Sequence, residues 1–118
     1  MTLRTALVTT IEGATGAKVH FNQKEPKDPI PATVIRIIGD MPLITVDANQ
    51  TGLSRARIQV TSIDDDYSGL ETLVAATEAA LFANITDFEV SLPLEIKLED
   101  KEDTLHYSIR EYLIWYRK

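Results

Sequence analysis

The chain has no cysteine among its 118 residues, which excludes a disulfide framework and thiolate chemistry. It has no apolar run near the roughly 18 residues that a membrane-spanning helix needs. The N-terminus reaches Thr9, Thr10 and Glu12 too early for a signal peptide. We therefore expect a protein that is made in the cytoplasm and does not enter a membrane.

Basic residues are too few for general binding of nucleic acid. The net charge is −6, whereas such binding needs clustered Lys and Arg to displace counterions. The charge is also uneven: residues 1–59 have a net charge of +2 and residues 60–118 a net charge of −8. Solvated loops explain such a split, and so does a subunit with two unlike faces that binds its neighbours head to tail.

The sequence motifs of common enzymes are missing. Gly13-Ala14-Thr15-Gly16 lacks the flanking pattern of a nucleotide-binding loop and follows a predicted helix rather than a strand. There is no zinc-ligand spacing and no nucleophile elbow. We expect no enzyme activity and no cofactor.

Asp64-Asp65-Asp66 and the two histidines, His20 and His106, are the remaining candidates for chemistry. Adjacent carboxylates can bind Mg²⁺ or Ca²⁺, but neighbouring strand residues point to opposite faces. Acidic residues also favour the start of a helix, which is the interpretation we prefer. A general base would need a positioned partner, and the sequence indicates none for either histidine. A small metal-dependent hydrolase using Asp64, Asp66 and His106 stays open as an alternative.

Hydrophobic periodicity predicts two helices and five strands. The helices span residues 2–12 and 68–83, and the strands span residues 18–21, 32–38, 54–63, 87–99 and 105–117. Between them we expect loops at residues 22–31, 43–53 and 99–104 and a turn at residues 39–42. With no internal linker, residues 1–118 form one domain. The order α-β-β-β-α-β-β predicts an α+β fold in which two helices pack on one face of a largely antiparallel sheet.

Several details of these elements can be tested. Ser68 and Glu71 have the spacing of a capping box at the start of helix 68–83. Leu70, Leu73, Val74 and Leu81 form its apolar stripe, and the Thr77 hydroxyl can bond back to a carbonyl one turn earlier.

The last two strands raise further expectations. The apolar residues from Phe88 to Leu98 alternate without a fault and should share one face, and Pro93 places that strand at an edge or a bulge. Glu111 interrupts an apolar face of strand 105–117, so that either a bulge shifts the register there or Glu111 faces a partner.

Three segments together resemble the tail completion proteins of siphophages and prophages, a group that includes the tail terminators. They are Val19-His20-Phe21 with the following loop and residues 31–37, residues 55–60 with the helix ending at Ala79-Ala80-Leu81, and residues 98–107 with the closing residues 111–117. Their order and spacing match over nearly the whole chain. The resemblance implies a virion structural protein without catalytic residues. It also implies a ring, expected to be a hexamer, that stops growth of the tail tube at its head-proximal end and meets the head connector. A head-completion or neck adaptor protein is the sibling alternative.

The resemblance implies partners: further copies of the chain, the tail tube protein and the head connector, first in the host cytoplasm and then in the virion. A polar strand face and the charged loops are the expected contact elements. Their candidate residues are Arg55, Arg57, Gln59, Lys24, Lys27, Asp28, Asp47, Asp100, Glu102 and Asp103. Aromatic and basic residues mix near the C-terminus, at Tyr112, Trp115 and Arg117. They could stack on bases, but the negative net charge favours sheet packing with a rim for a protein interface.

Overall fold

The computed structural model describes residues 3–23, 30–44, 50–84, 88–102 and 105–117, with the backbone alone for residues 42–44, 50–53, 91–102 and 117. It contains two helices, α1 (Leu3–Thr15) and α2 (Tyr67–Ala83). The five strands are β1 (Lys18–Phe21), β2 (Ala32–Ile44), β3 (Gln50–Asp64), β4 (Phe88–Glu102) and β5 (Leu105–Arg117). The predicted α-β-β-β-α-β-β order is confirmed.

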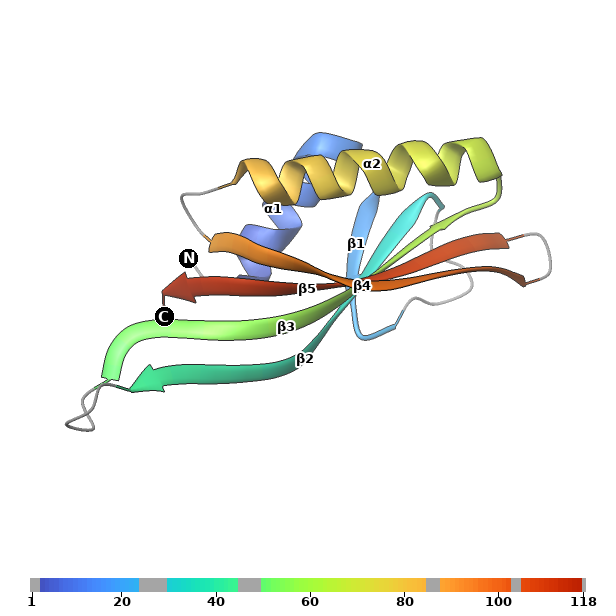
Figure 1. The fold of residues 1–118 in the computed structure, drawn as a ribbon. Coiled ribbons are helices and arrows are strands. Elements are labelled where there is room, and N and C mark those ends of the chain that lie inside the picture. The colour runs from blue at the N-terminus through green and yellow to red at the C-terminus, as the bar shows by residue number, and fades with distance from the viewer. Residues whose placement is uncertain (1–2, 24–29, 45–49, 85–87, 103–104, 118) are drawn as a thin grey trace.

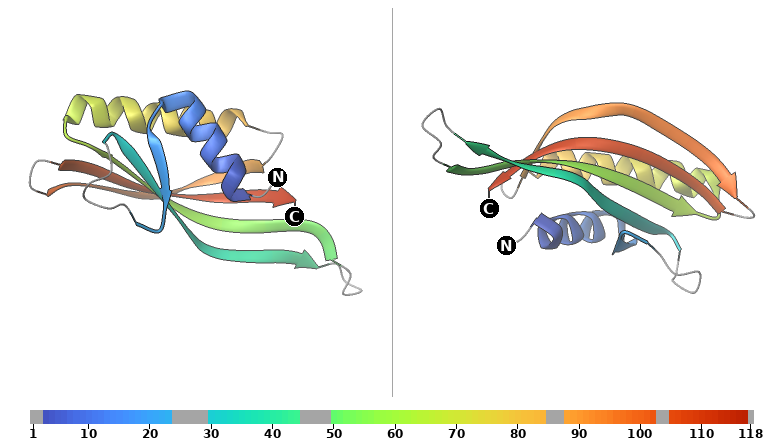
Figure 2. Two further views of the ribbon diagram at one scale, coloured as in Figure 1. Left: turned by 180° about the vertical axis from the view of Figure 1, so that it is seen from behind. Right: turned by 90° about the horizontal axis from the view of Figure 1, so that it is seen from below.

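The strands form one sheet in the order β1-β2-β3-β5-β4, in which only β1 and β2 are parallel. Both helices lie on the same side of this twisted sheet, and α2 runs across it (Figure 1). Seen from below, the strands lie in front of α2, with no helix over them (Figure 2). The predicted α+β class with both helices on one face is therefore confirmed.

Helix α1 is longer than the predicted 2–12 because Gly13 does not end it. The helix continues to Thr15, whose hydroxyl donates to the Ile11 carbonyl at 2.8 Å. Gly16 then adopts a φ of +73°, and its N–H donates to the Glu12 carbonyl at 2.9 Å. This is the usual left-handed glycine stop.

The central strands are longer than predicted, and residues 39–42 are not a turn. Strand β2 continues through them to Ile44, and β3 begins at Gln50 instead of residue 54. A bulge between Ile37 and Gly39 absorbs the irregular sequence. Pro42 is tolerated because β1 pairs with β2 no further than Ile35. Beyond Ile35, β2 therefore has no described strand on its other side, which is the edge setting in which a strand proline is found.

Helix α2 is capped by Asp66, so the predicted capping box at Ser68 and Glu71 is wrong. The Asp66 carboxylate accepts from the Gly69 N–H at 3.2 Å, and the Asp66 backbone is extended, as expected for an N-cap. Ser68 already lies inside the helix, where its carbonyl accepts from the Thr72 hydroxyl.

The predicted apolar stripe of α2 is confirmed, with Leu70, Leu73 and Leu81 buried and Val74 half-buried. Thr77 is buried among them, but its hydroxyl has no hydrogen-bond partner among the described residues. The predicted bond back to the helix backbone is therefore wrong.

Strand β4 lies at the sheet edge, as Pro93 indicated. The prediction that apolar residues alternate without a break along β4 is wrong, however. Val90 pairs with Ile114 and Leu92 with Leu113, so β4 advances two residues while β5 advances one. A second irregularity follows between Leu94 and Leu98. Because the first bulge gives β4 one residue more than β5, the alternation between the two faces is broken between Val90 and Leu92.

The core lies between the helices and the inner face of the sheet. From the helices, Leu7, Ile11 and Leu81 are fully buried; from the sheet, Ile58 and Ile114 are. Because strand side chains alternate, burial of Ala56, Ile58 and Val60 places the intervening residues of β3 on the opposite face. No described helix is long and apolar enough to cross a membrane.

Candidate functional site

The helix-free side of the sheet is the candidate interaction site, and we call it the outer face. It is defined by the described residues Arg36, Met41, Arg55, Arg57, Gln59, Glu111, Leu113 and Trp115. Cross-strand pairing puts them in three rows: Arg36–Gln59–Glu111, then Arg57–Leu113, then Met41–Arg55–Trp115. The three predicted interface residues of β3, Arg55, Arg57 and Gln59, thus lie together on one rigid surface.

Arg57 is held in place by Glu111. The Arg57 Nε donates to Glu111 Oε1 at 2.8 Å, and the two side chains are 48% and 7% exposed. Glu111 is thus buried on a face that no described helix covers. The ion pair orients the Arg57 guanidinium while leaving about half of its side chain open to a partner.

Of the two alternatives for Glu111, a register shift is absent from the β3–β5 pairing, and a contact with a partner molecule stays a prediction. The β3–β5 register runs without a shift from Leu53–Arg117 to Asp64–His106, and the bulges belong to β4. The partner of Glu111 is Arg57 of the same chain, one diagonal step away across the strand pair. In the sequence, a carboxylate on an otherwise apolar strand face indicated that Glu111 has a special role. The sequence did not show the cross-strand register that places Arg57 next to it.

Arg55 lies over an aromatic ring at the end of the same face. Its guanidinium carbon is 5.8 Å from the centre of the Trp115 ring, and its Nη2 lies 3.9 Å from the Met41 sulfur. Met41 is 57% exposed, a high value for a large apolar side chain. Arginine, tryptophan and methionine are enriched at protein interfaces, so this end of the outer face has the composition of a contact surface.

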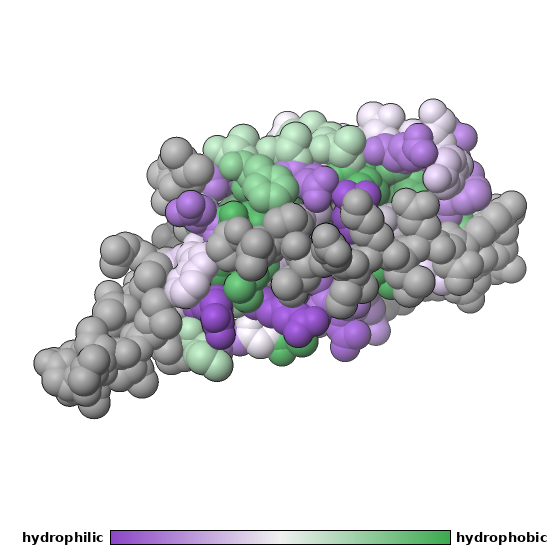
Figure 3. All heavy atoms as spheres, viewed as in Figure 1, coloured by the Kyte–Doolittle hydropathy of each residue, from purple (hydrophilic) through white to green (hydrophobic). Residues whose placement is uncertain are grey.

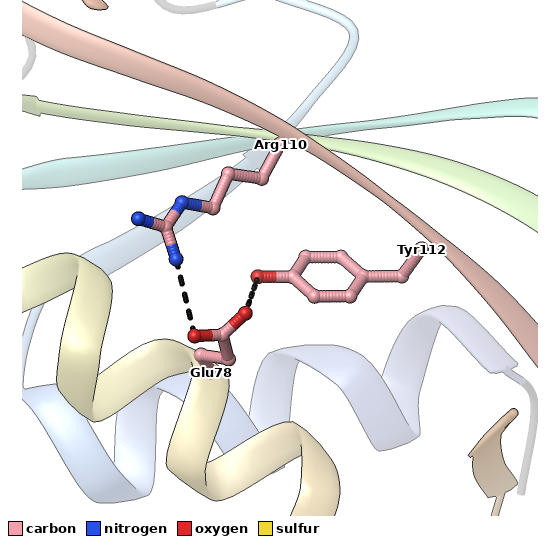
Figure 4. Close-up of polar contacts among 3 residues, drawn as sticks. All are labelled: Glu78, Arg110 and Tyr112. Carbon is pink, nitrogen blue, oxygen red and sulfur yellow. Dashed lines mark hydrogen bonds and ion pairs between the residues drawn. The ribbon is translucent and has the colours of Figure 1, made fainter. Parts of the chain in front are cut away.

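A second polar cluster lies on the inner face, between α2 and β5, and has a structural role. Glu78 of α2 accepts from Arg110 Nη1 at 3.1 Å and from the Tyr112 hydroxyl at 3.3 Å (Figure 4). Burial, followed by the nearby Glu78 carboxylate, raises the pKa of Tyr112 to about 12. The cluster fastens α2 to the sheet, and no sequence motif indicated it.

A gap of about 10 Å³ lies beside this cluster, and its lining includes Val60, Ser62, Val74, Thr77 and Ser108. Within the described part of the chain, the hydroxyls of Thr77 and Ser108 and the Nε of Arg110 are buried there without hydrogen-bond partners. Such a space is too small for a substrate, since it matches about one water molecule.

The acidic run at residues 64–66 turns the chain from β3 into α2. Asp64 accepts from the Asp65 N–H at 2.7 Å, and Asp66 caps the helix. His106 pairs in register with Asp64 and meets the Tyr67 ring edge-on at 5.8 Å. Among the described residues, no group of three acidic or histidine side chains is placed to hold a metal ion. An open hollow of about 430 Å³ adjoins these three aspartates. The ionisable side chains that line the hollow are Asp64 and Asp66, and both already accept hydrogen bonds from backbone N–H groups.

The contact role of every predicted interface residue stays a prediction, and the remaining ones lie away from the outer face or outside the described residues. Lys24, Lys27, Asp28, Asp47 and Asp103 lie outside the described residues. Asp100 and Glu102 belong to β4, where their backbones pair with Tyr107 and Leu105. Their contact role stays a prediction.

Comparison with known proteins gives a likeness of fold alone. No protein-family model and no curated protein matches the chain. Among solved structures, the chain is similar to a chain from the virion of a native gene transfer agent particle, with a TM-score of 0.51 and 11% sequence identity. The match covers 98% of this chain and 89% of that one. The two chains therefore share an architecture along almost their whole lengths.

Proposed function

We propose that this protein is a structural subunit of a phage-like virion, and that within it the protein acts as a tail terminator. In this role, copies form a ring, expected to be a hexamer, on the head-proximal end of the tail tube. The ring stops the addition of tube subunits and offers the head connector a surface. The protein acts through binding and carries no catalytic group.

The observation that carries the proposal is the end-to-end similarity of fold to a chain of a gene transfer agent virion. The match covers 98% of this chain and 89% of the virion chain. The outer face adds a second support. Two of its arginines, Arg57 and Arg55, are held by Glu111 and Trp115, so these two lose little side-chain freedom when a partner binds.

A terminator needs two unlike surfaces. One must bind the last ring of the tube, and the other must not recruit a further ring. The uneven charge of this chain and its asymmetric sheet, with helices on one side and the outer face on the other, suit such a subunit (Figure 1).

The test is deletion of the gene from the particle that encodes it, followed by measurement of tail lengths by negative-stain electron microscopy. Loss of a terminator should give overlong tails that are not joined to heads, and the wild-type gene supplied in trans should restore normal length. Tails of normal length that fail to join heads would contradict termination and indicate a neck adaptor. Normal, infectious particles would contradict a virion role.

A further inference from the structure

Negative charge is concentrated in one long stretch of this chain. Residues 58–96 contain eight Asp and Glu residues and no Lys or Arg. Among the described ones, Asp65, Asp66 and Glu71 are exposed where β3 turns into α2. We call Asp65, Asp66 and Glu71 the acidic corner. In Figure 3, hydrophilic side chains gather over this first part of α2, whereas its later turns present apolar ones.

Positive charge is concentrated on the outer face. Arg36, Arg57 and Arg55 step diagonally across β2 and β3, roughly 7 Å apart along the strands because alternate residues share a face. Arg36 and Arg57 are exposed, and among the described residues Glu111 forms an ion pair with one of the three arginines, Arg57. Arg55 and Arg57 are already positioned by Trp115 and Glu111.

The two charged surfaces lie in different places. The acidic corner follows the end of β3, whereas Arg55 lies toward its beginning, in a molecule 54 Å long. One copy therefore cannot bring its own corner onto its own outer face. A second copy can, and a contact between two different patches of identical chains is head-to-tail and repeats into a ring or a filament.

We propose that the acidic corner of one copy binds the outer face of the next copy, with Asp65 and Glu71 opposite Arg36 and Arg55. The contact rests on the proposed function, which requires a ring, and gives that ring its subunit interface. The exposed Met41 side chain and the Trp115 ring supply apolar area beside the charges. Nucleic acid is a poorer occupant, because Glu111 lies within the face and the net charge of the chain is −6.

The choice of charges to reverse follows from the structure. Arg57 is left intact, since a glutamate there would lie beside the buried Glu111. Asp66 is left intact, since it caps α2. The face variant is Arg36→Glu with Arg55→Glu, and the corner variant is Asp65→Lys with Glu71→Lys. A control, Arg4→Glu with Thr9→Glu and Gln23→Glu, makes the same charge change as the face variant, at exposed sites off the outer face.

Self-association is measured by sedimentation velocity of the full chain at low salt, with circular dichroism to verify folding. Each variant alone should weaken self-association by at least about tenfold, because attraction at two charge pairs becomes repulsion. An equimolar mixture of the face variant and the corner variant should regain self-association, because the reversed face of one chain can bind the reversed corner of the other. A single chain carrying all four substitutions should regain self-association for the same reason. The control should behave as the wild type does, and salt should weaken every complex.

The rescue is the deciding result. Variants that associate as the wild type does, or a mixture that stays dissociated while both variants are folded, would overturn the contact. So would a wild-type chain that stays monomeric at its highest soluble concentration. If the face variant misfolds, Arg36→Gln with Arg55→Gln replaces it and should weaken association less. These measurements use the purified chain without virions, so their outcomes are separate from the tail-length test. If tails end at normal length but the mixed variants do not associate, the proposed contact is rejected and the proposed function is not.

Discussion

Arg57 and Glu111 form an ion pair across the two central strands, with Nε and Oε1 2.8 Å apart, on the side of the sheet that no described helix covers. Their exposures are unequal, at 48% for Arg57 and 7% for Glu111. The carboxylate has therefore lost most of its water and depends on the arginine, whereas the arginine keeps much of its hydration. This asymmetry has consequences for stability.

Removing Arg57 should cost more stability than neutralising Glu111. Arg57→Ala leaves a buried carboxylate without its partner, which typically costs about 1–3 kcal/mol. Glu111→Gln leaves a half-exposed arginine that water can still solvate, so its cost should be under about 1 kcal/mol. Urea unfolding of both variants measures the difference. Equal losses, or a larger loss for Glu111→Gln, would mean that Glu111 is not dependent on Arg57.

Truncation of Leu73 tests the packing of α2 on the sheet. Leu73 is buried, so Leu73→Ala should lower the free energy of unfolding by about 2–5 kcal/mol. The matched control is Thr72→Ala, at the neighbouring exposed position, which should change it by less than about half a kcal/mol. A small loss at Leu73 in chemical denaturation would be inconsistent with the described core.

Replacement of Thr77 by valine tests the unbonded hydroxyl. The two side chains have nearly the same shape, and Thr77 Oγ1 has no described hydrogen-bond partner. Thr77→Val should therefore leave stability unchanged or raise it by up to about 1 kcal/mol, while Thr77→Ala, which removes packed volume, should lower it. A loss above about 1 kcal/mol for valine would show that the hydroxyl is bonded in solution, for example to a water in the adjoining gap.

Alkaline pH should destabilise the fold through Tyr112. Its pKa is raised to about 12, chiefly by burial and then by Glu78. The stabilisation is complete below about pH 10, where a tyrosine of the unfolded chain keeps its proton. As pH rises from about 10 to about 12, the unfolded chain releases that proton first, so stability falls. Tyr112→Phe should flatten this fall in urea unfolding across the same range; an unchanged slope would assign the effect to other groups.

Regular patterns in the sequence were enough to predict the element order, the fold class and the buried stripe of α2. Several of the failures at the sheet share a physical cause, which is that a local signal competed with strand pairing. Residues 39–42 have a turn composition, but pairing with residues 54–57 keeps them in β2, with a bulge to accommodate Gly39. At the start of α2 the failure is different: Asp66, rather than Ser68, accepts the capping hydrogen bond from the Gly69 N–H.

For the candidate site, alternation correctly placed Arg55, Arg57 and Gln59 on one polar face. The sequence could not supply the register that brings Arg57 to Glu111 and Arg55 to Trp115, because those contacts join residues more than fifty positions apart. The Glu78–Arg110–Tyr112 cluster was missed for the same reason, since its members come from a helix and a strand separated by more than thirty positions.

The most direct measurement of the proposed function is the length distribution of tail tubes assembled in vitro with and without the purified protein. Tube protein from the same particle is allowed to polymerise, the chain is added during growth, and tubes are imaged by negative stain. A terminator should stop elongation and leave a ring at one end of each tube, with the average length set by the time of addition. Tubes that continue to grow at the same rate, with bare ends and with the added protein folded, would contradict the account.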